Sequence, residues 1–335
     1  MRGARQILPG LLGLLGLLGL AGCDREPAAA PQTPMTSTTP LVVPETEQVA
    51  LLEAFQEEAT PVLRKLVVAA PGFREAVHAL LMDTDEEALE IARNAWTLLY
   101  ESYNRAWPVL ATRGELDPTL VPHLARADTW PILPGYIDAM PEWPDSGIVY
   151  DVTVDVDINT LLSLHGMTDP SEVAVGFQVL ELLLFGLPDA PREVAGLAPV
   201  VVTESEAEKP LNEYPEMRRR AYLDAASALL LEDLSALIHP QPLPDAARLP
   251  EALSRGLRSS RERLAALQAQ GPAEAGEGTD GGEYLSARSH DVALAALTEA
   301  LAAWQDADQP AGAALSSWRA TVAGTPATGE GQATP

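Results

Sequence analysis

One short run restricts the fold of this chain more than any other, the segment from Val175 to Gly186, "VGFQVLELLLFG". On a helix its residues are apolar on every side, and Glu181 is its only charged residue. Such a helix has to be surrounded by other elements, and a carboxylate inside it is strongly unfavourable unless it is paired or binds a metal. The segment therefore predicts a buried helix in which Glu181 has a partner. That partner is either an internal salt-bridge or hydrogen-bond network or the remnant of a ligand site.

Both ends of this helix carry sequence signals. Asp169 is a favourable N-cap, Pro170 suits the first helical position, and Glu172 completes a capping box. Gly186 is a typical helix end. We therefore expect a helix from Asp169 to Gly186, in which Gly176 allows another stretch of backbone to come close.

Helical periodicity also dominates the remaining chain. The expected helices cover approximately residues 47–70, 71–82, 84–110, 159–165, 213–239, 245–270, 283–307 and 311–323. Pro61 should kink or split the first of them. The segment "GIVYDVTVDVDI", residues 147–158, alternates apolar and polar residues, which favours a short extended piece. These patterns predict an all-α fold of two helical-bundle halves packed together, with a short irregular or extended central segment.

The helix expected at residues 84–110 is amphipathic. The residues predicted on its buried side are Ile91, Ala95, Leu98 and Leu99. Aromatic residues also recur on it at helical steps, namely Trp96, Tyr100, Tyr103 and Trp107. Packing in the core explains these aromatics more simply than a ligand-binding role does.

The N-terminus has the features of a lipoprotein signal peptide at residues 1–22. Two arginines precede a short Leu/Gly-rich apolar stretch, which "LAGC" ends at Cys23. Cys23 is the only cysteine, at the position where a bacterial lipobox is acylated; the alternative is an ordinary signal peptide with a chance cysteine. Residues 23–44 are expected to form a disordered tether and residues 324–335 a disordered tail, on either side of a helical domain at 45–323 with halves at about 45–165 and 166–323.

The charge of the chain restricts its partners. The net charge is −26, which repels phosphate backbones and so predicts no nucleic-acid partner. It suits a solvated protein on the periplasmic face of the cell envelope, anchored to a membrane through Cys23. Whether the inner or the outer membrane holds the anchor is left open.

The search for catalytic motifs gives little. The sequence has no H-E-x-x-H zinc pair, no G-x-S-x-G elbow and no phosphate loop, so we predict no catalytic residue. Glu75 and His78 form one Glu-x-x-His pair, a spacing that di-iron bundles use in duplicate. A single pair of this kind is typical of a surface contact, and a metal role is the alternative.

The residues from Gly135 to Gly186, "GYIDAMPEWPDSGIVYDVTVDVDINTLLSLHGMTDPSEVAVGFQVLELLLFG", resemble the central region of the imelysin-like proteins, the M75 peptidase family. The family signature is G-x-H-x-x-E within a run similar to "GFHALEFLLWG". The positions that match this run are Gly176, Phe177, Leu180, Glu181, Leu183, Leu184 and Gly186. "AWTLLYESY", from Ala95, resembles the first long helix of the family, with Tyr100 where many members carry arginine.

This resemblance implies an all-α fold of two bundle-like halves with the signature helix at their interface. It also implies a bacterial envelope protein, often a lipoprotein, linked to iron uptake and in some members described as a metallopeptidase. The signature carries over to Gly176, Gln178 and Glu181, with glutamine where the family has histidine. A glutamine amide is a weak, neutral ligand that cannot titrate near neutral pH, so it replaces imidazole neither toward iron or zinc nor in acid–base chemistry.

Two functions follow as the main alternatives, beside a third in which the chain is a purely structural lipid-anchored protein. In the first, the chain is a non-catalytic binding or accessory component beside an envelope or iron-uptake protein, with a degenerate metal site and no cofactor. In the second, it is an M75-type metallopeptidase or a metal-binding iron-uptake protein. A divalent metal, iron or zinc, would then be bound by Glu181 with residues such as Glu75 and His78.

Overall fold

The computed structural model describes residues 45–202, 208–239, 247–271, 282–305 and 312–317. All of them belong to one compact unit that begins at Val42. The predicted signal peptide, Cys23, the tether and the tail at 324–335 lie outside the described residues.

The described residues confirm the all-α prediction. Five long helices dominate them: α1 (Glu45–Met82), α2 (Glu86–Leu116), α7 (Pro215–Ile238), α8 (Leu249–Gln270) and α9 (Ala287–Gln305). The shorter ones are α3 (Val121–Ala127), α4 (Pro134–Ile137), α5 (Ile158–Leu164) and α6 (Phe177–Phe185), and residues 312–317 are helical too. Single 3-10 turns lie at Pro118–Leu120, Val194–Leu197 and Leu211–Glu213, and β1 (Gly186–Leu187) pairs antiparallel with β2 (Ala190–Pro191).

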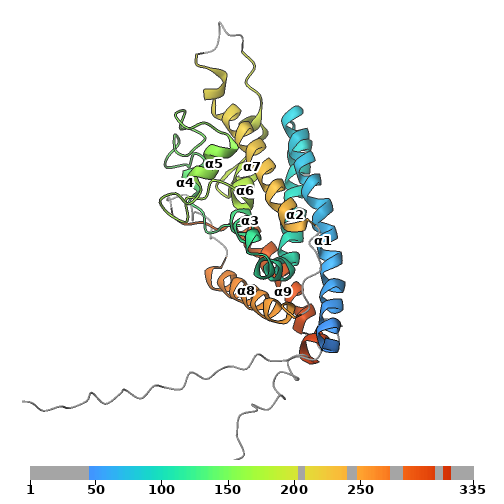
Figure 1. The fold of residues 1–335 in the computed structure, drawn as a ribbon. Coiled ribbons are helices and arrows are strands. Elements are labelled where there is room, and N and C mark those ends of the chain that lie inside the picture. Colours follow the sequence, from blue (N-terminus) through green and yellow to red (C-terminus); the bar gives the residue numbers. More distant parts are fainter. Residues whose placement is uncertain (1–44, 203–207, 240–246, 272–281, 306–311, 318–335) are drawn as a thin grey trace, which may run out of the picture. The chain divides into compact units, whose positions relative to one another are not determined.

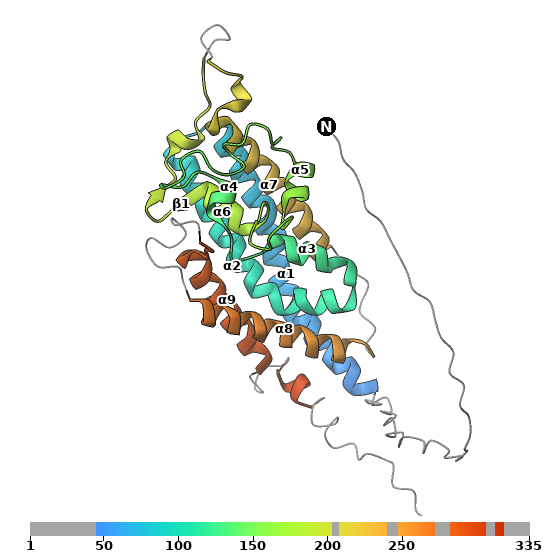
Figure 2. The ribbon, with the colours of Figure 1, turned by 90° about the vertical axis from the view of Figure 1, so that its left-hand side faces the viewer.

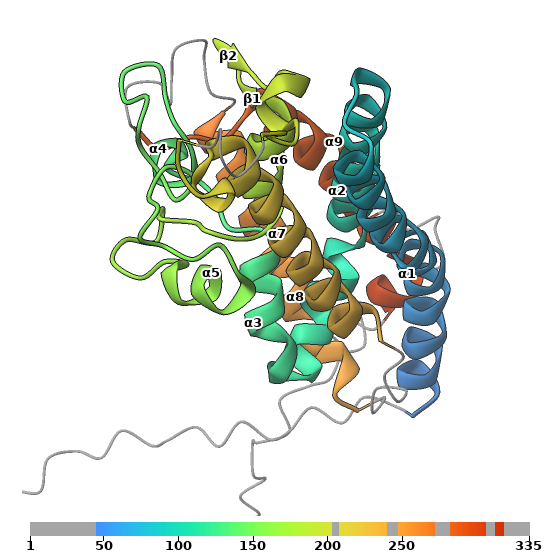
Figure 3. The same cartoon turned by 90° about the horizontal axis from the view of Figure 1, so that it is seen from above.

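The long helix α2 packs against α1, α8 and α9, and α1 also packs against α7 (Figures 1 and 3). The short helix α6 lies against both α2 and α7 (Figure 2). Helices from before and after residue 165 are thus interleaved around α2 and α6. No described helix is both long and apolar enough to cross a bilayer.

Pro61 does not split the helix, and the boundary expected between residues 70 and 71 is wrong, because α1 runs without interruption from Glu45 to Met82 and contains both Pro61 and Pro71. A proline removes one backbone hydrogen bond from a helix. Both proline rings are exposed, so the carbonyl that each leaves without a partner can be hydrated. The opposite side of α1 is held by its buried apolar residues, among them Leu66 and Phe73.

The start expected for the signature helix is also wrong, since α6 begins at Phe177 and not at Asp169. The capping groups are used in a local turn instead. Asp169 accepts a hydrogen bond from the Ser171 N–H at 2.8 Å, and Glu172 accepts one from the Thr168 N–H at 3.2 Å. These bonds satisfy the two side chains eight and five residues before the helix begins.

The extended piece expected at 147–158 is not a strand, because these residues form successive turns. The buried side chain of Arg218 takes up carbonyls that a strand would offer to a neighbouring strand. It donates to the carbonyl oxygens of Val149 at 2.8 Å, Ile148 at 2.8 Å, Asp151 at 2.7 Å and Val154 at 2.7 Å.

The buried side predicted for α2 is partly wrong as well. Leu99 is buried, but Ile91 and Leu98 are 51% and 58% exposed. The side of α2 that faces inward is instead the aromatic one, with Trp96, Tyr100 and Tyr103 fully buried. Aromatic side chains bury more surface area than aliphatic ones. The orientation of α2 that buries its aromatic side is therefore the more favourable one.

Candidate functional site

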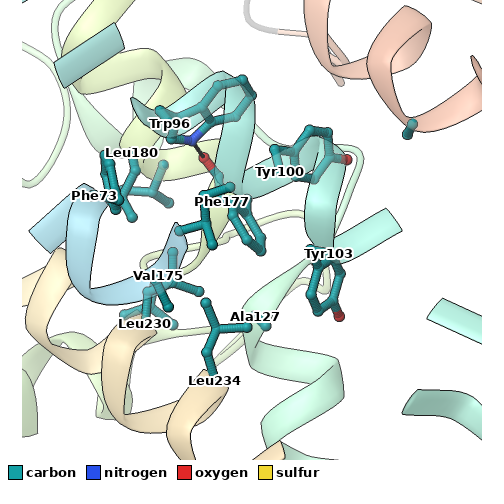
Figure 4. Close-up of a cluster of buried hydrophobic side chains, with 14 of the residues drawn as sticks. Phe73, Trp96, Tyr100, Tyr103, Ala127, Val175, Phe177, Leu180, Leu230 and Leu234 are labelled. Atoms are coloured by element: carbon teal, nitrogen blue, oxygen red, sulfur yellow. Dashed lines mark hydrogen bonds between the residues drawn. The ribbon is translucent and has the colours of Figure 1, made fainter. Parts of the chain in front are cut away.

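The helix α6 lies in the middle of the core, as its apolar sequence predicted. Phe177, at its first position, contacts the aromatic residues of α2, with ring centroids 4.9 Å from Tyr100 and 5.0 Å from Tyr103 (Figure 4). The Trp96 indole N–H donates to the carbonyl oxygen of Phe177 at 3.1 Å. These contacts confirm core packing for the α2 aromatics and position the signature residues of α6 relative to α2.

Gly176 allows the close backbone approach that the sequence predicted. Its φ of 99° and ψ of −172° lie in a region that is almost restricted to glycine. A Cβ atom at this position would lie 2.4 Å from the carbonyl oxygen of Arg126 and 2.7 Å from that of Ala127. The end of α3 therefore passes directly beside the start of α6, which brings the following residue, Asp128, toward Gln178.

Gln178 is 3% exposed and is part of a buried hydrogen-bond network. Its amide Nε2 donates to Asp128 Oδ1 at 2.9 Å and to Tyr100 Oη at 3.1 Å. The Tyr100 hydroxyl in turn donates to Asp128 Oδ2 at 3.1 Å. At the position of the family's histidine, the chain thus directs an N–H donor toward a carboxylate.

That carboxylate is already paired. Arg263, on α8, donates to Asp128 Oδ2, and their side chains are 9% and 0% exposed. Arg263 also donates to Asn104 Oδ1 at 3.0 Å and lies over the ring of Trp107. Burial by itself lowers the pKa of the Arg263 guanidinium, but the attraction of Asp128 outweighs it with help from Tyr100, and the net pKa is raised. The arginine therefore stays charged inside the protein.

Glu181 has partners, as its buried position predicted, and they come from the start of α9. Ser286 Oγ donates to Glu181 Oε1, and Ser289 Oγ donates to Oε2 at 2.6 Å. Arg288 Nη1 lies 3.6 Å from Oε1. Since the N-terminal end of a helix carries partial positive charge, this is a favourable place for a carboxylate. Glu181 thereby fixes α9 to α6.

The pKa of Glu181 is raised, because burial disfavours the charged carboxylate more than Ser286, Ser289 and Arg288 favour it. The folded protein then holds this proton more tightly than the unfolded chain does. The contribution of Glu181 to stability is therefore complete below the carboxyl's ordinary pKa and decreases as the pH rises through the raised value.

We expect the Glu181→Gln variant to be less sensitive to this rise in pH, because its amide is neutral throughout. The variant should gain stability relative to wild type as the pH rises above the ordinary pKa of a carboxyl group, measured as the free energy of unfolding in urea at several pH values. The exposed glutamate Glu262 of α8 provides the control, and Glu262→Gln should leave the pH profile unchanged. A gap between wild type and Glu181→Gln that is constant over pH would contradict the raised pKa.

A cavity of about 370 Å³ opens beside Glu181. It is also lined by Arg93, Arg288, Phe185 and Tyr284. The two guanidinium groups lie near the ring of Phe185, with Cζ of Arg288 3.8 Å and Cζ of Arg93 5.4 Å from its centroid. The signature glutamate therefore lies at a cavity whose other charged side chains are cationic.

The structure does not bring Glu75 and His78 to this cavity. Both are exposed on α1, where they line a separate surface depression, whereas Glu181 is buried. Within the described ranges, no three histidine, cysteine, aspartate or glutamate side chains lie close enough together to hold a metal ion.

Several buried ion pairs were not found from the sequence. The chief ones are Asp128 with Arg263, and Asp138 with both Arg219, at 2.7 Å, and Arg192, at 2.6 Å. The partners in each pair are 54 to 135 residues apart in sequence. No local pattern indicates these pairs. The one usable signal is the run Arg218 to Arg220, because α7 contains no other basic residue.

The fold and this arrangement define a class: an all-α domain built around a buried Gly-x-Gln-x-x-Glu helix. The chain belongs to the imelysin family, since the family model Imelysin (Peptidase_M75) matches residues 59–298, more than half of the sequence. The comparison with curated proteins found no match.

Proposed function

We propose that this chain is a lipid-anchored protein of the bacterial envelope whose imelysin domain is a non-catalytic binding or accessory component related to iron uptake. One observation carries the non-catalytic part of the proposal. The amide of Gln178, at the position of the signature histidine, donates to a carboxylate that is already neutralised by Arg263.

The donor set around the signature does not fit a resident iron or zinc ion. Gln178 directs N–H groups toward Asp128, and both oxygens of Glu181 accept hydrogen bonds from serines. The guanidinium groups of Arg263 and Arg288 lie where a second cation would be repelled. Borderline metals are usually held by three or four nitrogen, sulfur or carboxylate ligands, and the described residues around Glu181 supply no group of three such side chains.

The binding part of the proposal rests on the cavity beside Glu181. Its volume of about 370 Å³ lies at the small end of the range of roughly 300–1,000 Å³ that ligand sites occupy. Two arginines and a buried carboxylate give the cavity polar groups that can orient a ligand, and the ring of Phe185 gives it an apolar surface. A binding role needs no group in the cavity that titrates near neutral pH, so it survives the replacement of histidine by glutamine.

The first test is metal analysis. After dialysis, the purified protein should contain no stoichiometric iron or zinc, and titration calorimetry with either ion should show only weak binding. His78→Ala is the control, because it removes the exposed imidazole and should change nothing. Tight stoichiometric metal in wild type would contradict the proposal and favour the metallopeptidase or metal-binding alternative built on Glu181.

The second test restores the signature histidine. We expect Gln178→His to gain no metal-dependent rise in melting temperature, because Arg263 still occupies Asp128 and Arg288 still faces Glu181. A ligand that bound only the folded state would raise the melting temperature in proportion to its affinity. A clear rise with zinc or iron, absent from wild type, would show that the rest of a metal shell persists.

The anchor has its own test. We expect Cys23→Ser either to release the protein from membranes or to leave the precursor uncleaved, because the serine hydroxyl replaces the thiol that is acylated. Membrane fractionation with an immunoblot for precursor and mature forms measures both results. Normal cleavage together with normal membrane retention would contradict lipidation at Cys23.

A further inference from the structure

A second cavity, larger than the one at Glu181, lies on the surface between α1 and α2. Its volume is about 640 Å³, well within the range of roughly 300–1,000 Å³ that is typical of ligand sites. Ala69 and Phe73 of α1 contribute buried apolar side chains to it. Gly72 has no side chain, and a Cβ atom at this position would meet nothing within 4 Å. The groove is therefore open at this point.

The groove is bordered by large apolar side chains that no described residue covers. Val68 of α1 and Leu98 of α2 line it and are 69% and 58% exposed. Ile91, two turns before Leu98 on α2, continues this apolar surface and is 51% exposed. Neighbouring exposed apolar residues of this size are characteristic of binding surfaces.

Charge in the groove is concentrated at one end. The helices α1 and α2 are antiparallel and lie side by side (Figure 3), so Arg64 and Lys65 of α1 lie across from Arg105 of α2. Arg105 is paired with Glu101 and Glu299, and the charge of Lys65 also helps to lower the pKa of Glu299. Arg64 and Lys65 are both exposed, and neither forms a direct ion pair within the described ranges. In a chain with a net charge of −26, these two cations form a local positive end. The apolar residues lie toward the other end.

We propose that this groove binds a single-chain anionic amphiphile of the fatty-acid class. The carboxylate of the ligand pairs with Arg64 and Lys65, and its alkyl chain lies along Val68, Gly72 and Leu98 toward Ile91. The separation of charge and apolar surface along the groove matches a head-to-tail ligand. An amphipathic helix would instead place apolar anchors along the whole groove, whereas one end of this groove is lined by charged side chains. The site is distinct from the cavity at Glu181.

The test uses residues 24–335, which contain the whole compact unit from Val42 onward, so that no attached lipid competes. Sodium dodecanoate, below its micellar concentration, is titrated into the protein and binding is measured by calorimetry. We expect saturable binding at one site. Dodecyltrimethylammonium, which has the same alkyl chain and a cationic head, should bind at least about tenfold more weakly, which corresponds to the loss of one ion pair.

Variants locate the site. Lys65→Glu and Leu98→Asp should each weaken dodecanoate binding about tenfold or more. The matched controls are Arg258→Glu on α8 and Val121→Asp on α3. Both positions are exposed, and both variants should bind dodecanoate as wild type does. Should Leu98→Asp fail to fold, Gly72→Trp fills the groove without a change in charge and should also abolish binding. Glu181→Gln should retain full affinity, which separates this proposal from the proposed function.

Three results would overturn the proposal. These are equal affinity for the cationic amphiphile, unchanged affinity in the groove variants, and the absence of saturable dodecanoate binding. If dodecanoate fails to bind but an acidic amphipathic Leu/Glu peptide binds wild type and not Leu98→Asp, the groove is a docking site for a helical partner instead.

Discussion

Replacing Asp128 with alanine is expected to lower the free energy of unfolding by about 3–5 kcal/mol, the loss that follows removal of one partner from a buried ion pair. The side chain of Asp128 is fully buried, and Arg263 would keep its charge with no carboxylate beside it. The amide of Gln178 and the hydroxyl of Tyr100 would lose the same acceptor. The loss of stability should therefore exceed that of an alanine substitution that removes only one buried polar contact.

Urea denaturation monitored by circular dichroism measures this loss. A matched control is Asp224→Ala, which breaks an aspartate–arginine pair with Arg74 whose aspartate side chain is 52% exposed. Exposed pairs contribute about 0–1 kcal/mol, so this variant should remain close to wild type. The double variant Asp128→Ala/Arg263→Met should recover part of the stability, because it removes both buried charges. Equal losses in Asp128→Ala and Asp224→Ala would show that the Gln178 network is not buried in solution.

The sequence was most informative where one residue alone fixes the physics. An apolar helix with one carboxylate has to be buried with a partner for the carboxylate, and Glu181 meets both expectations. The serines that supply the partner, Ser286 and Ser289, lie more than 100 residues later, at the start of a predicted helix whose periodicity does not indicate which helix it contacts. The need for a partner could be predicted, but its identity depended on tertiary packing.

Local signals misled where two structures could use them equally well. Asp169 and Glu172 are as suitable for a tight turn as for a helix N-terminus, and in the structure they close a turn. The apolar stripe of α2 through Ile91 and Leu98 had a competitor on the same helix, the aromatic side, and the larger side chains are the buried ones. Periodicity shows that a helix has an apolar side, but it does not rank two such sides.

The most specific architectural residue of the signature is its glycine. Gly176→Ala is expected to destabilise the protein by about 3–5 kcal/mol, from the strain of a glycine-only backbone conformation together with overpacking. Its φ is 99°, and the new Cβ would lie 2.4 Å from the carbonyl oxygen of Arg126. Because that contact is with backbone at the end of α3, no side-chain rotation relieves it. The end of α3 or the start of α6 would have to move.

Gly166→Ala separates the two contributions to this loss. Gly166 also has a positive φ, 65°, but a Cβ atom there would meet nothing within 4 Å, so its substitution carries backbone strain alone, about 1–2 kcal/mol. Urea denaturation of both variants should therefore show a clearly larger loss for Gly176→Ala, and similar losses would refute the close approach of α3. A movement of the end of α3 would also displace Asp128 from Gln178. The double variant Gly176→Ala/Asp128→Ala should therefore lose less stability than the sum of the losses of the two single variants. That shortfall would show that the signature glycine maintains the buried network in a chain that lacks the signature histidine.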